Sequence, residues 1–236
     1  MLKANQEFYD PLWKSSRLIR PERFNTWPLV SDLAGKCPRR LEVGPGLRPR
    51  LPLKETRFLD SSEVAVAKLR NGGADALAGL ISALPFPDGS FDLVCALDII
   101  EHVDGDDSAL AELARVSAPG ATFLVAVPLH AASWTPFDDF VGHRRRYDPC
   151  EFLTKLEEHG FAVEESATYG MQTKSSRLVG LGMWCLTNRP GEAMWWYNNI
   201  FMPLGLWFQK PLKLIPGMVN TENVDQILLV CRKTAG

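Results

Sequence analysis

Between residues 38 and 170, short apolar runs alternate with segments whose apolar residues recur at the spacing of an α-helix. The strongest run, 91–97, is nearly continuous in apolar residues, which is typical of a strand buried on both faces of a parallel sheet. Further strands are predicted at 40–43, 57–59, 121–127, 161–169 and 224–232. Strands that alternate with helices over this length predict a doubly wound, mostly parallel α/β sheet.

The predicted helices carry recognisable start and stop signals. Residues 61–70 have a serine available as N-cap and apolar positions along one face. A second helix is predicted to begin at Asp106 or Asp107 and to end at Gly120. A third has an N-cap acceptor at Asp148, followed by proline at the first helical position and glutamate at the third, and we expect it to end at Gly160.

Two regions fall outside this alternation within what we expect to be one domain, 1–236. Residues 1–37 are predicted to form a helical cover, 38–170 the ligand-binding core, and 224–236 the last strand and tail. Residues 171–223 form a long insertion with four of the seven tryptophans and several prolines. We favour a lid over an apolar site, while a homodimer surface or a peripheral membrane contact stays open for 171–223.

Composition narrows the class of protein. The 236 residues include 26 Lys and Arg against 28 Asp and Glu, a net charge of −2, which argues against a dedicated nucleic-acid binder. The five scattered cysteines form no C-x-x-C pair, which suits free thiols in a reducing compartment and indicates neither disulfides nor a metal site. The charged N-terminus is not a signal peptide, and no apolar run is long enough to span a membrane, so we expect a cytoplasmic protein.

The first constellation with chemical meaning is Leu-Glu-Val-Gly-Pro-Gly at 41–46, in which a strand ends in an acid and a Gly-x-Gly turn follows. Glycines there let a ligand approach the backbone, although a turn that simply needs glycine fits equally well. Asp60 ends the next strand, 18 residues after Glu42, and can accept both hydroxyl protons of a ribose. The alternative is that Asp60 caps the following helix, as Ser61 or Ser62 also could.

The residues of the turn also indicate which kind of nucleotide cofactor binds there. A dinucleotide site needs a third glycine, and that position is Pro49, which disfavours NAD. An acid directly before the turn suits a cation better than a phosphate. S-adenosylmethionine has a ribose, an ammonium and a sulfonium but no phosphate, so the charges favour this cofactor.

With these residues in place, the chain resembles the class I S-adenosylmethionine-dependent methyltransferases of the small type called methyltransferase type 11. The resemblance covers residues 38–170 in the family's order. It rests on LEVGPG at 41–46, FLDSSEVAVAKLR at 58–70, ALPFPDGSFDLVCALDIIEHV at 83–103, ALAELARVSAPGATFLVAVP at 109–128 and GHRRRYDPCEFLTKLEEHGF at 142–161. It implies a seven-stranded Rossmann-like sheet whose last strand, 224–232, is antiparallel.

The resemblance also implies where the cofactor binds. The turn after the first strand would line the methionine and ribose, Asp60 would hold the ribose hydroxyls, and Leu97 and Asp98 would face the sulfonium. The implied cofactor-binding residues are Glu42, Gly44, Pro45, Gly46, Asp60, Ser61, Ile81, Ser82, Ala83, Leu97 and Asp98.

Two positions depart from the family pattern. Arg48 stands where the family often has a third glycine, and Leu80 where it usually has an aspartate that bonds adenine, with Asp75 five residues earlier. Backbone groups at Ile81 or Ser82 can still read the adenine edge, so we expect an altered pocket.

On the acceptor side, positioning alone can lower the barrier by ~7–11 kcal/mol, and a general base adds roughly 10²–10⁴-fold. His102 and His143 are the candidate bases, because imidazole titrates near neutral pH. Arg144, Tyr147 and Trp134 are candidates for contacting the acceptor. For His102 the alternative is support of its loop. For the run 143–147 it is a solvated loop, or ion pairs with Asp138 and Asp139.

These observations predict a methyltransferase that uses S-adenosylmethionine on a small, apolar or lipid-like acceptor and binds no nucleic acid. A non-catalytic cofactor-binding or interaction protein on the same fold is the first alternative. An NAD-dependent oxidoreductase is a weaker one.

Overall fold

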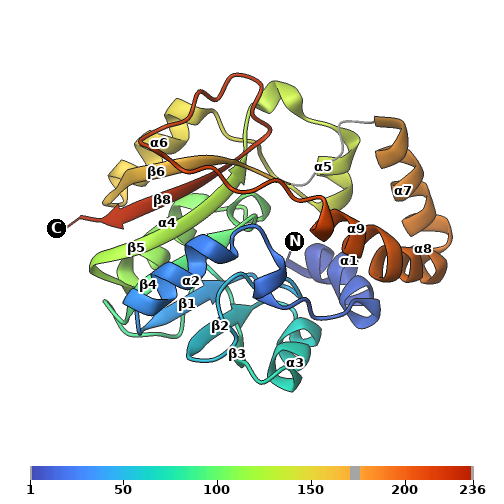
Figure 1. Cartoon of the computed structure of the whole chain (residues 1–236), viewed down its shortest axis with the longest axis horizontal. Coiled ribbons are helices and arrows are strands. Elements are labelled where there is room, and N and C mark those ends of the chain that lie inside the picture. The colour runs from blue at the N-terminus through green and yellow to red at the C-terminus, as the bar shows by residue number, and fades with distance from the viewer. Residues whose placement is uncertain (1, 171–175, 235–236) are drawn as a thin grey trace.

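The apolar runs form one eight-stranded sheet (Figure 1) in a computed structural model that describes residues 2–170 and 176–234. Across the sheet the strands follow the order β3, β2, β1, β4, β5, β8, β6, β7. Their bounds are β1 Arg40–Val43, β2 Thr56–Asp60, β3 Asp75–Ala78, β4 Phe91–Leu97, β5 Ser117–Pro128, β6 Phe161–Tyr169, β7 Ile215–Pro216 and β8 Gln226–Lys233.

The sheet confirms the predicted class and shows one more strand than expected. The first five strands in chain order pair in parallel, and β8 runs antiparallel to both of its neighbours, β5 and β6. The extra strand, β7, is two residues long and pairs with Glu165 and Ser166 of β6. Its brevity explains why no apolar pattern marks it.

Helices cover both faces of the sheet. Helices of at least six residues are α1 Leu2–Ser15, α2 Trp27–Lys36, α3 Glu63–Asn71, α4 Asp106–Val116, α5 Pro136–Val141, α6 Pro149–Glu158, α7 Ser176–Asn188, α8 Pro190–Trp196 and α9 Met202–Trp207. Single helical turns are η1 Pro21–Arg23, η2 Ile100–His102 and η3 Ala131–Ser133, and a five-residue π-helical segment, η4, spans Tyr197–Phe201.

Alternate residues of the central strands supply two cores. Val94 and Ala96 of β4 pack with α4 and α6 on one face, whereas Leu93 and Cys95 pack with Val30 of α2 on the other. This division follows from the two-residue period of a strand. A run buried on both faces is therefore apolar throughout, as the sequence pattern of 91–97 predicts.

Capping residues fix the predicted helix starts. Ser62 caps α3, and Asp148 accepts hydrogen bonds from the backbone N–H groups of Cys150 and Glu151 at the start of α6. The predicted end of the second helix at Gly120 is wrong, because α4 ends at Val116. The chain turns directly into β5, and Gly120 lies within that strand.

Helix α1 and the helices of the insertion, α7, α8 and α9, lie together at one side of the molecule (Figure 1). Helix α1 contacts α3 and α8, and α7 contacts α5 and α8. Of the predicted insertion 171–223, residues 171–175 lie outside the described residues, as do Met1 and the tail residues 235–236. Within the described part of the chain, none of the helices is both long and apolar enough to cross a bilayer.

Candidate active site

Three carboxyl groups lie at the ends of neighbouring strands. Glu42 lies near the end of β1, Asp60 ends β2, and Asp98 follows β4 directly. Because β2, β1 and β4 are adjacent and parallel, these ends meet at one edge of the sheet, where ligands of doubly wound folds bind.

Glu42 organises the turn that follows β1. Its carboxylate accepts hydrogen bonds from the backbone N–H groups of Arg50, at 2.9 and 3.0 Å, and of Leu51, at 2.8 Å. Burial raises the pKa of Glu42 to about 7, and these two N–H groups oppose the shift. Near neutral pH the Glu42 carboxyl is therefore about half protonated and half ionised.

Asp60 ties the glycine turn to the start of α3. Its Oδ2 accepts from the Gly46 N–H at 2.8 Å and its Oδ1 from the Ser62 N–H at 2.9 Å. Burial raises the pKa of this carboxyl as well, against the effect of both bonds. Each carboxylate oxygen keeps acceptor capacity for a further donor. Ser62, and not Asp60, is the N-cap of α3.

Two glycines are required by the turn itself. Gly44 and Gly46 have φ of +68° and +53°, a region that side chains rarely adopt. A Cβ at Gly44 would meet Ile99 at 2.5 Å, and one at Gly46 would meet the Trp13 ring at 2.5 Å. Pro45 lies between them, and its carbonyl accepts from the Arg48 N–H. Helix α1 thus packs through Trp13 directly on the turn.

Asp98 sits in a strained backbone conformation at the centre of the site. Its φ is +54°, and its N–H donates to the Ala126 carbonyl at 3.0 Å. Burial raises the pKa of Asp98 to about 6, while Arg50 and then Arg48 act in the opposite direction. Leu97, which precedes it, packs against the core on the α2 side of the sheet.

Arg50 is a half-buried cation of this region, and the sequence pattern did not reveal it. Its guanidinium lies 3.6 Å from the centre of the Phe24 ring and donates to the Tyr169 hydroxyl at 3.1 and 3.3 Å. Arg48 donates to the Tyr197 hydroxyl in η4. An arginine two residues beyond a glycine turn is a weak sequence signal, because its partners are distant in the chain.

The predicted adenine side lies beyond β3. Ile81 is buried and Ser82 and Ala83 follow it, with Ala83 bridging back to Leu80. Asp75 begins β3 and pairs with Arg57 at 2.9 Å. Since β3 runs parallel to β2 and Ala78 aligns with Asp60, Asp75 lies at the opposite end of the strand. It does not take the place of the family's adenine-bonding aspartate.

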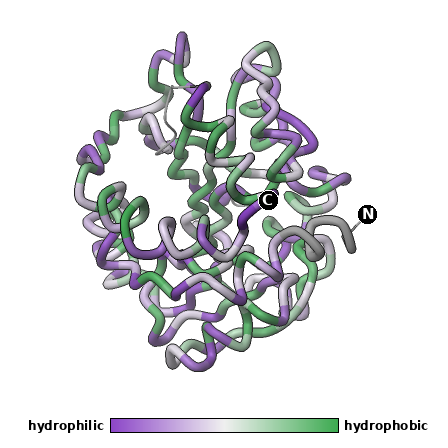
Figure 2. Tube along the Cα trace, turned by 90° about the vertical axis from the view of Figure 1, so that its right-hand side faces the viewer, coloured by the Kyte–Doolittle hydropathy of each residue, from purple (hydrophilic) through white to green (hydrophobic). Residues whose placement is uncertain are grey.

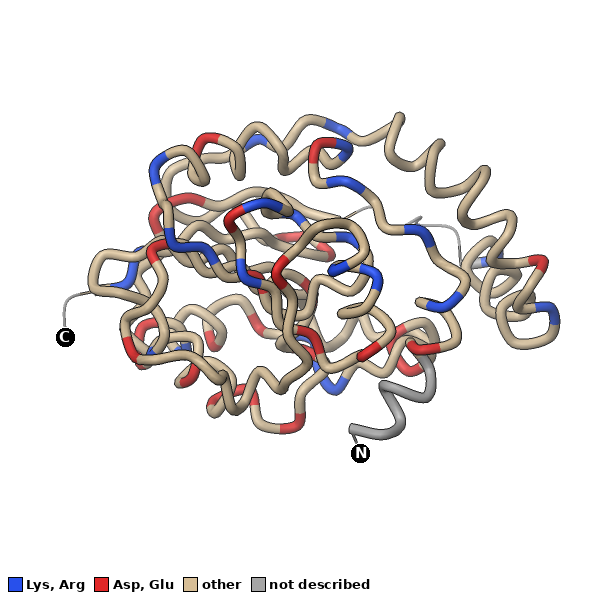
Figure 3. Tube along the Cα trace, turned by 90° about the horizontal axis from the view of Figure 1, so that it is seen from below, with Lys and Arg blue, Asp and Glu red and all other residues tan. Residues whose placement is uncertain are grey.

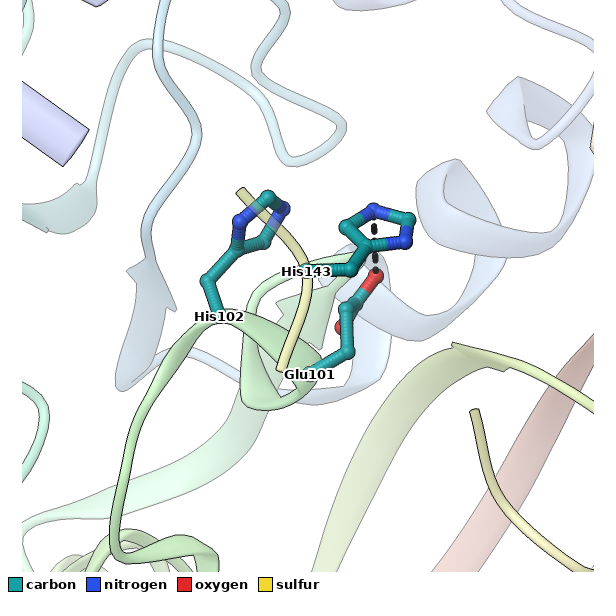
Figure 4. A group of neighbouring side chains, drawn as sticks. All are labelled: Glu101, His102 and His143. Atoms are coloured by element: carbon teal, nitrogen blue, oxygen red, sulfur yellow. Dashed lines mark ion pairs between the residues drawn. The ribbon is translucent and has the colours of Figure 1, made fainter. Parts of the chain in front are cut away.

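The two candidate bases lie together, next to Glu101 (Figure 4). The rings of His102 and His143 are 4.7 Å apart between centroids, and His143 Nε2 lies 3.9 Å from Glu101 Oε1. Burial lowers the pKa of His102 to about 3 and also lowers that of His143, so both rings are neutral at pH 7. Burial raises the pKa of Glu101, and the nearby charge of Asp98 raises it further.

The arginine run mostly forms the ion pairs that were the alternative to acceptor binding. Arg146 contacts Asp138 at 2.9 Å and Asp225 at 2.6 Å, and Arg145 contacts Asp106 at 2.6 Å. Asp139 makes no ion pair with the run among the described residues.

The three acceptor candidates are not brought together. Arg144 pairs with Asp104 at 3.3 Å and stays partly exposed. The buried Tyr147 hydroxyl donates to Asp106 of α4 at 3.1 Å, so it is turned toward that helix. Trp134 donates its indole N–H to Asp139 at 3.2 Å and is 37% exposed.

The charges of the strand ends fit a cationic nucleoside. Glu42, Asp60 and Asp98 all have raised pKa values because burial disfavours their charged forms. A bound cation would stabilise these charges, as a nearby positive group does for any buried carboxylate. The space beside Gly46 is filled by Trp13, so a ligand there is in contact with α1 or displaces it.

Comparison with known proteins finds a methyltransferase domain and methyltransferase relatives. Residues 47–125 match the family model of a methyltransferase domain. A probable S-adenosylmethionine-dependent methyltransferase of Mycolicibacterium smegmatis is 33% identical over 111 residues, 45% of this chain and 42% of that protein. A ubiquinone/menaquinone biosynthesis C-methyltransferase of Methylobacterium nodulans is 33% identical over 153 residues, 59% of this chain and 55% of that protein. The chain thus spans about half the length of these relatives.

Solved structures show the same fold. An S-adenosylmethionine-dependent methyltransferase of Thermotoga maritima, described as a possible histamine N-methyltransferase, superposes with a TM-score of 0.59 at 18% identity. The superposition covers 89% of this chain and 91% of that one. Residues 47–125 thus match a methyltransferase domain, and the chain has the fold of S-adenosylmethionine-dependent methyltransferases of known structure.

Proposed function

We propose that the chain transfers a methyl group from S-adenosylmethionine to a small, apolar, lipid-like acceptor. The observation that carries the proposal is the group of three carboxyls at adjacent parallel strand ends, the buried Glu42 and Asp60 and the half-buried Asp98. They concentrate negative charge at one edge of the sheet, which disfavours a phosphate-bearing nucleotide and favours a sulfonium.

Each carboxyl has a distinct part in holding the cofactor. Asp60 accepts the ribose hydroxyls with the acceptor capacity that its two backbone bonds leave unused. Glu42 keeps the turn closed through Arg50 and Leu51. Asp98 presents its charge at the end of β4, toward the side where methyl transfer takes place. When bound, the cofactor supplies an electrophilic methyl group.

The rest of the chain positions the acceptor and keeps water out. Trp13 and Tyr9 of α1 stack at 5.5 Å between ring centroids, and Trp13 covers the turn. The neutral imidazole of His143 can take a proton from an acceptor hydroxyl, whereas His102 beside it, with a pKa of about 3, is too weak a base for this. This action concerns the acceptor and leaves the cofactor's contacts unchanged.

Support for an apolar acceptor comes from the helices at the edge of the molecule. Figure 2 faces the side that carries α7, α8 and α9 in Figure 1, and Figure 3 shows few charges along α7, whose one charged residue is Arg177. Large apolar side chains remain well exposed there, among them Trp184, Trp195, Trp196, Phe201, Trp207 and Phe208. The Methylobacterium nodulans relative is named for quinone methylation, which is consistent with a lipid-like acceptor.

We further propose that this exposed apolar surface touches a membrane, from which the acceptor enters. Lys210 and Lys213 follow α9 and would meet anionic headgroups. A surface between two copies of the chain is the competing use. We place the protein in the cytoplasm, and the free thiols of its five cysteines support a reducing compartment.

Transfer of isotope from methyl-labelled S-adenosylmethionine tests the proposal. The purified chain is incubated with the labelled cofactor and either a demethylated naphthoquinol or an organic extract of cells. We expect label in the organic phase, and loss of that signal in Asp60→Ala. Tight cofactor binding with no movement of label into any fraction would instead indicate a non-catalytic binding protein.

A further inference from the structure

Glu101, His102 and His143 form a cluster of metal-ligand side chains from two separate segments. Glu101 and His102 belong to η2, and His143 lies on the loop after α5, 41 positions further along the chain. A backbone hydrogen bond of 2.7 Å from the Arg144 N–H to the Glu101 carbonyl holds the segments together. One nitrogen of each ring and one Glu101 oxygen all lie within 4.8 Å of one another (Figure 4).

Three side-chain atoms of this cluster lack hydrogen-bond partners. Across the described residues, 2–170 and 176–234, both carboxylate oxygens of Glu101 and Nδ1 of His102 make no hydrogen bond. Glu101 is fully buried. Leaving a buried polar group unpaired costs roughly 1–3 kcal/mol, and more when it is charged, so three such atoms in one place need an explanation.

Each histidine also has a polar neighbour outside the cluster. Nδ1 of His143 lies 2.8 Å from Asp138 Oδ1, and the Gly142 backbone lies beside His102. With Nδ1 of His143 held by Asp138, its Nε2 is the nitrogen on the side of Glu101. Asp138 is itself fixed by Thr135 and Arg146. Outer carboxylates and carbonyls that orient histidines in this way are characteristic of metal sites.

A shared proton does not account for the arrangement. The distance of 3.9 Å between His143 Nε2 and Glu101 Oε1 is too long for a hydrogen bond. A metal ion at roughly 2.0–2.2 Å from each ligand fits between atoms at such separations after a small closure.

We propose that Glu101, His102 and His143 bind a divalent transition-metal ion of the zinc class. Two imidazoles and one carboxylate are the ligands that such ions prefer, and three protein ligands leave a coordination position open. Asp98 lies three residues before Glu101, so the open position is close to the proposed site of methyl transfer. An oxygen of the acceptor could be polarised there, but ion binding itself does not depend on the acceptor's identity.

Titration of the chain with cobalt(II) tests this inference, because cobalt(II) replaces zinc and absorbs visible light when bound by nitrogen and oxygen ligands. After treatment with a chelator, the wild-type chain is expected to bind one equivalent and to develop that absorption. His102→Gln and His143→Gln are expected to weaken binding by more than the roughly 10–100-fold that loss of an outer-shell group costs.

His159→Gln is the matched control. His159 lies at the end of α6, beside Asp107 and away from the cluster, so this variant should bind cobalt(II) like the wild type. Circular dichroism and binding of S-adenosylhomocysteine show whether each variant is folded. If a variant does not fold, anomalous diffraction from zinc-soaked wild-type crystals decides, and its peak must lie among the three side chains. A wild-type chain that binds no cobalt(II), or variants that bind it equally well, would overturn the inference.

Discussion

Burial raises the pKa values of both Glu42 and Asp60, and each carboxyl offsets that cost by accepting backbone N–H groups of the turn between β1 and α3. Glu42 accepts hydrogen bonds from the backbone N–H groups of Arg50 and Leu51. Asp60 accepts them from those of Gly46 and Ser62. These acids are therefore structural elements of the turn and ligand-binding groups at once. A substitution at either position has to be interpreted through both effects.

Replacing Asp60 by alanine should weaken S-adenosylhomocysteine binding by more than tenfold, which is at least ~1.4 kcal/mol. The variant loses the acceptor for the ribose hydroxyls and also the bond to the Gly46 N–H. Isothermal titration calorimetry measures the change directly.

Asp75→Ala is the control for that measurement, because Asp75 is an exposed aspartate on the adjacent strand whose partner is Arg57. It should bind the ligand as the wild type does. Equal affinities for Asp60→Ala and the wild type would show that the ribose is held elsewhere.

The pKa of Glu42, about 7, predicts a pH dependence of cofactor binding. The pKa of Glu42 is higher in the folded chain than in the unfolded chain. Its contribution to the free energy of unfolding is therefore greatest below about pH 4.5 and is lost as the pH rises to about 7. A bound cation favours the ionised form, so affinity for S-adenosylmethionine should increase between about pH 6 and pH 8. Calorimetry across this range checks the trend, which Glu42→Gln should flatten.

At the level of elements, one lysine fastens the end of α1 to α3. Lys68 of α3 donates from Nζ to the carbonyls of Trp13, Lys14 and Ser16, at 2.6, 2.8 and 2.7 Å. The last carbonyls of a helix have no partners within the helix, so a cation there both satisfies them and interacts well with the helix dipole. This contact keeps α1 over the glycine turn.

Lys68→Met should therefore let α1 leave the turn more readily and speed cofactor dissociation. Hydrogen bonds to charged groups contribute roughly 1.5–3 kcal/mol, so we expect an increase of about tenfold or more. Stopped-flow displacement of bound S-adenosylhomocysteine gives the rate.

Lys36→Met provides the comparison, since Lys36 pairs with Asp32 on the surface of α2. An unchanged rate in Lys68→Met would mean that α1 does not limit cofactor exchange.

The sequence predicts those elements whose signals are local. The bounds of β4 and β6 agree with the predicted runs 91–97 and 161–169, and the start of α6 follows from its cap at Asp148. Two short strands, β3 and β7, were not predicted, because four and two residues carry too little pattern. β3 is recognisable through its pairing with β2, which the sequence does not display.

The residues of the site also divide into those that local sequence signals predict and those that they do not. The acids at strand ends can be located from a strand pattern followed by a glycine turn. The contacts of Trp13 with Gly46, and of Arg50 with Tyr169, join residues far apart in the chain. No local period encodes such contacts, and the same holds for the approach of His143 to Glu101.

Across the whole molecule, the exposed apolar side chains are concentrated at the end formed by α7, α8 and α9. Trp207 and Phe208 are 78% and 75% exposed. Inserting two such rings into a membrane interface is favourable by an amount on the order of 1.5–3 kcal/mol each if they become fully buried. Trp207→Ser with Phe208→Ser should thus reduce co-sedimentation with anionic phosphatidylglycerol vesicles by at least about tenfold.

Leu80→Ser, which alters an exposed apolar residue after β3, should leave vesicle binding unchanged. The wild-type chain could instead fail to bind vesicles and form a dimer in analytical ultracentrifugation. If the double variant no longer formed that dimer, the surface would be assigned to contact with a second copy of the chain.

The place of β8 in the sheet has a consequence for synthesis on the ribosome. β8 is the last strand in chain order, yet it pairs on one side with β5 and on the other with β6. Until residue 233 has emerged from the exit tunnel, β6 has no neighbour linking it to the parallel strands, and the edges of β5 and β6 stay open to other chains. Nascent chains stalled before this point should need chaperones, whereas chains released beyond it can complete the sheet.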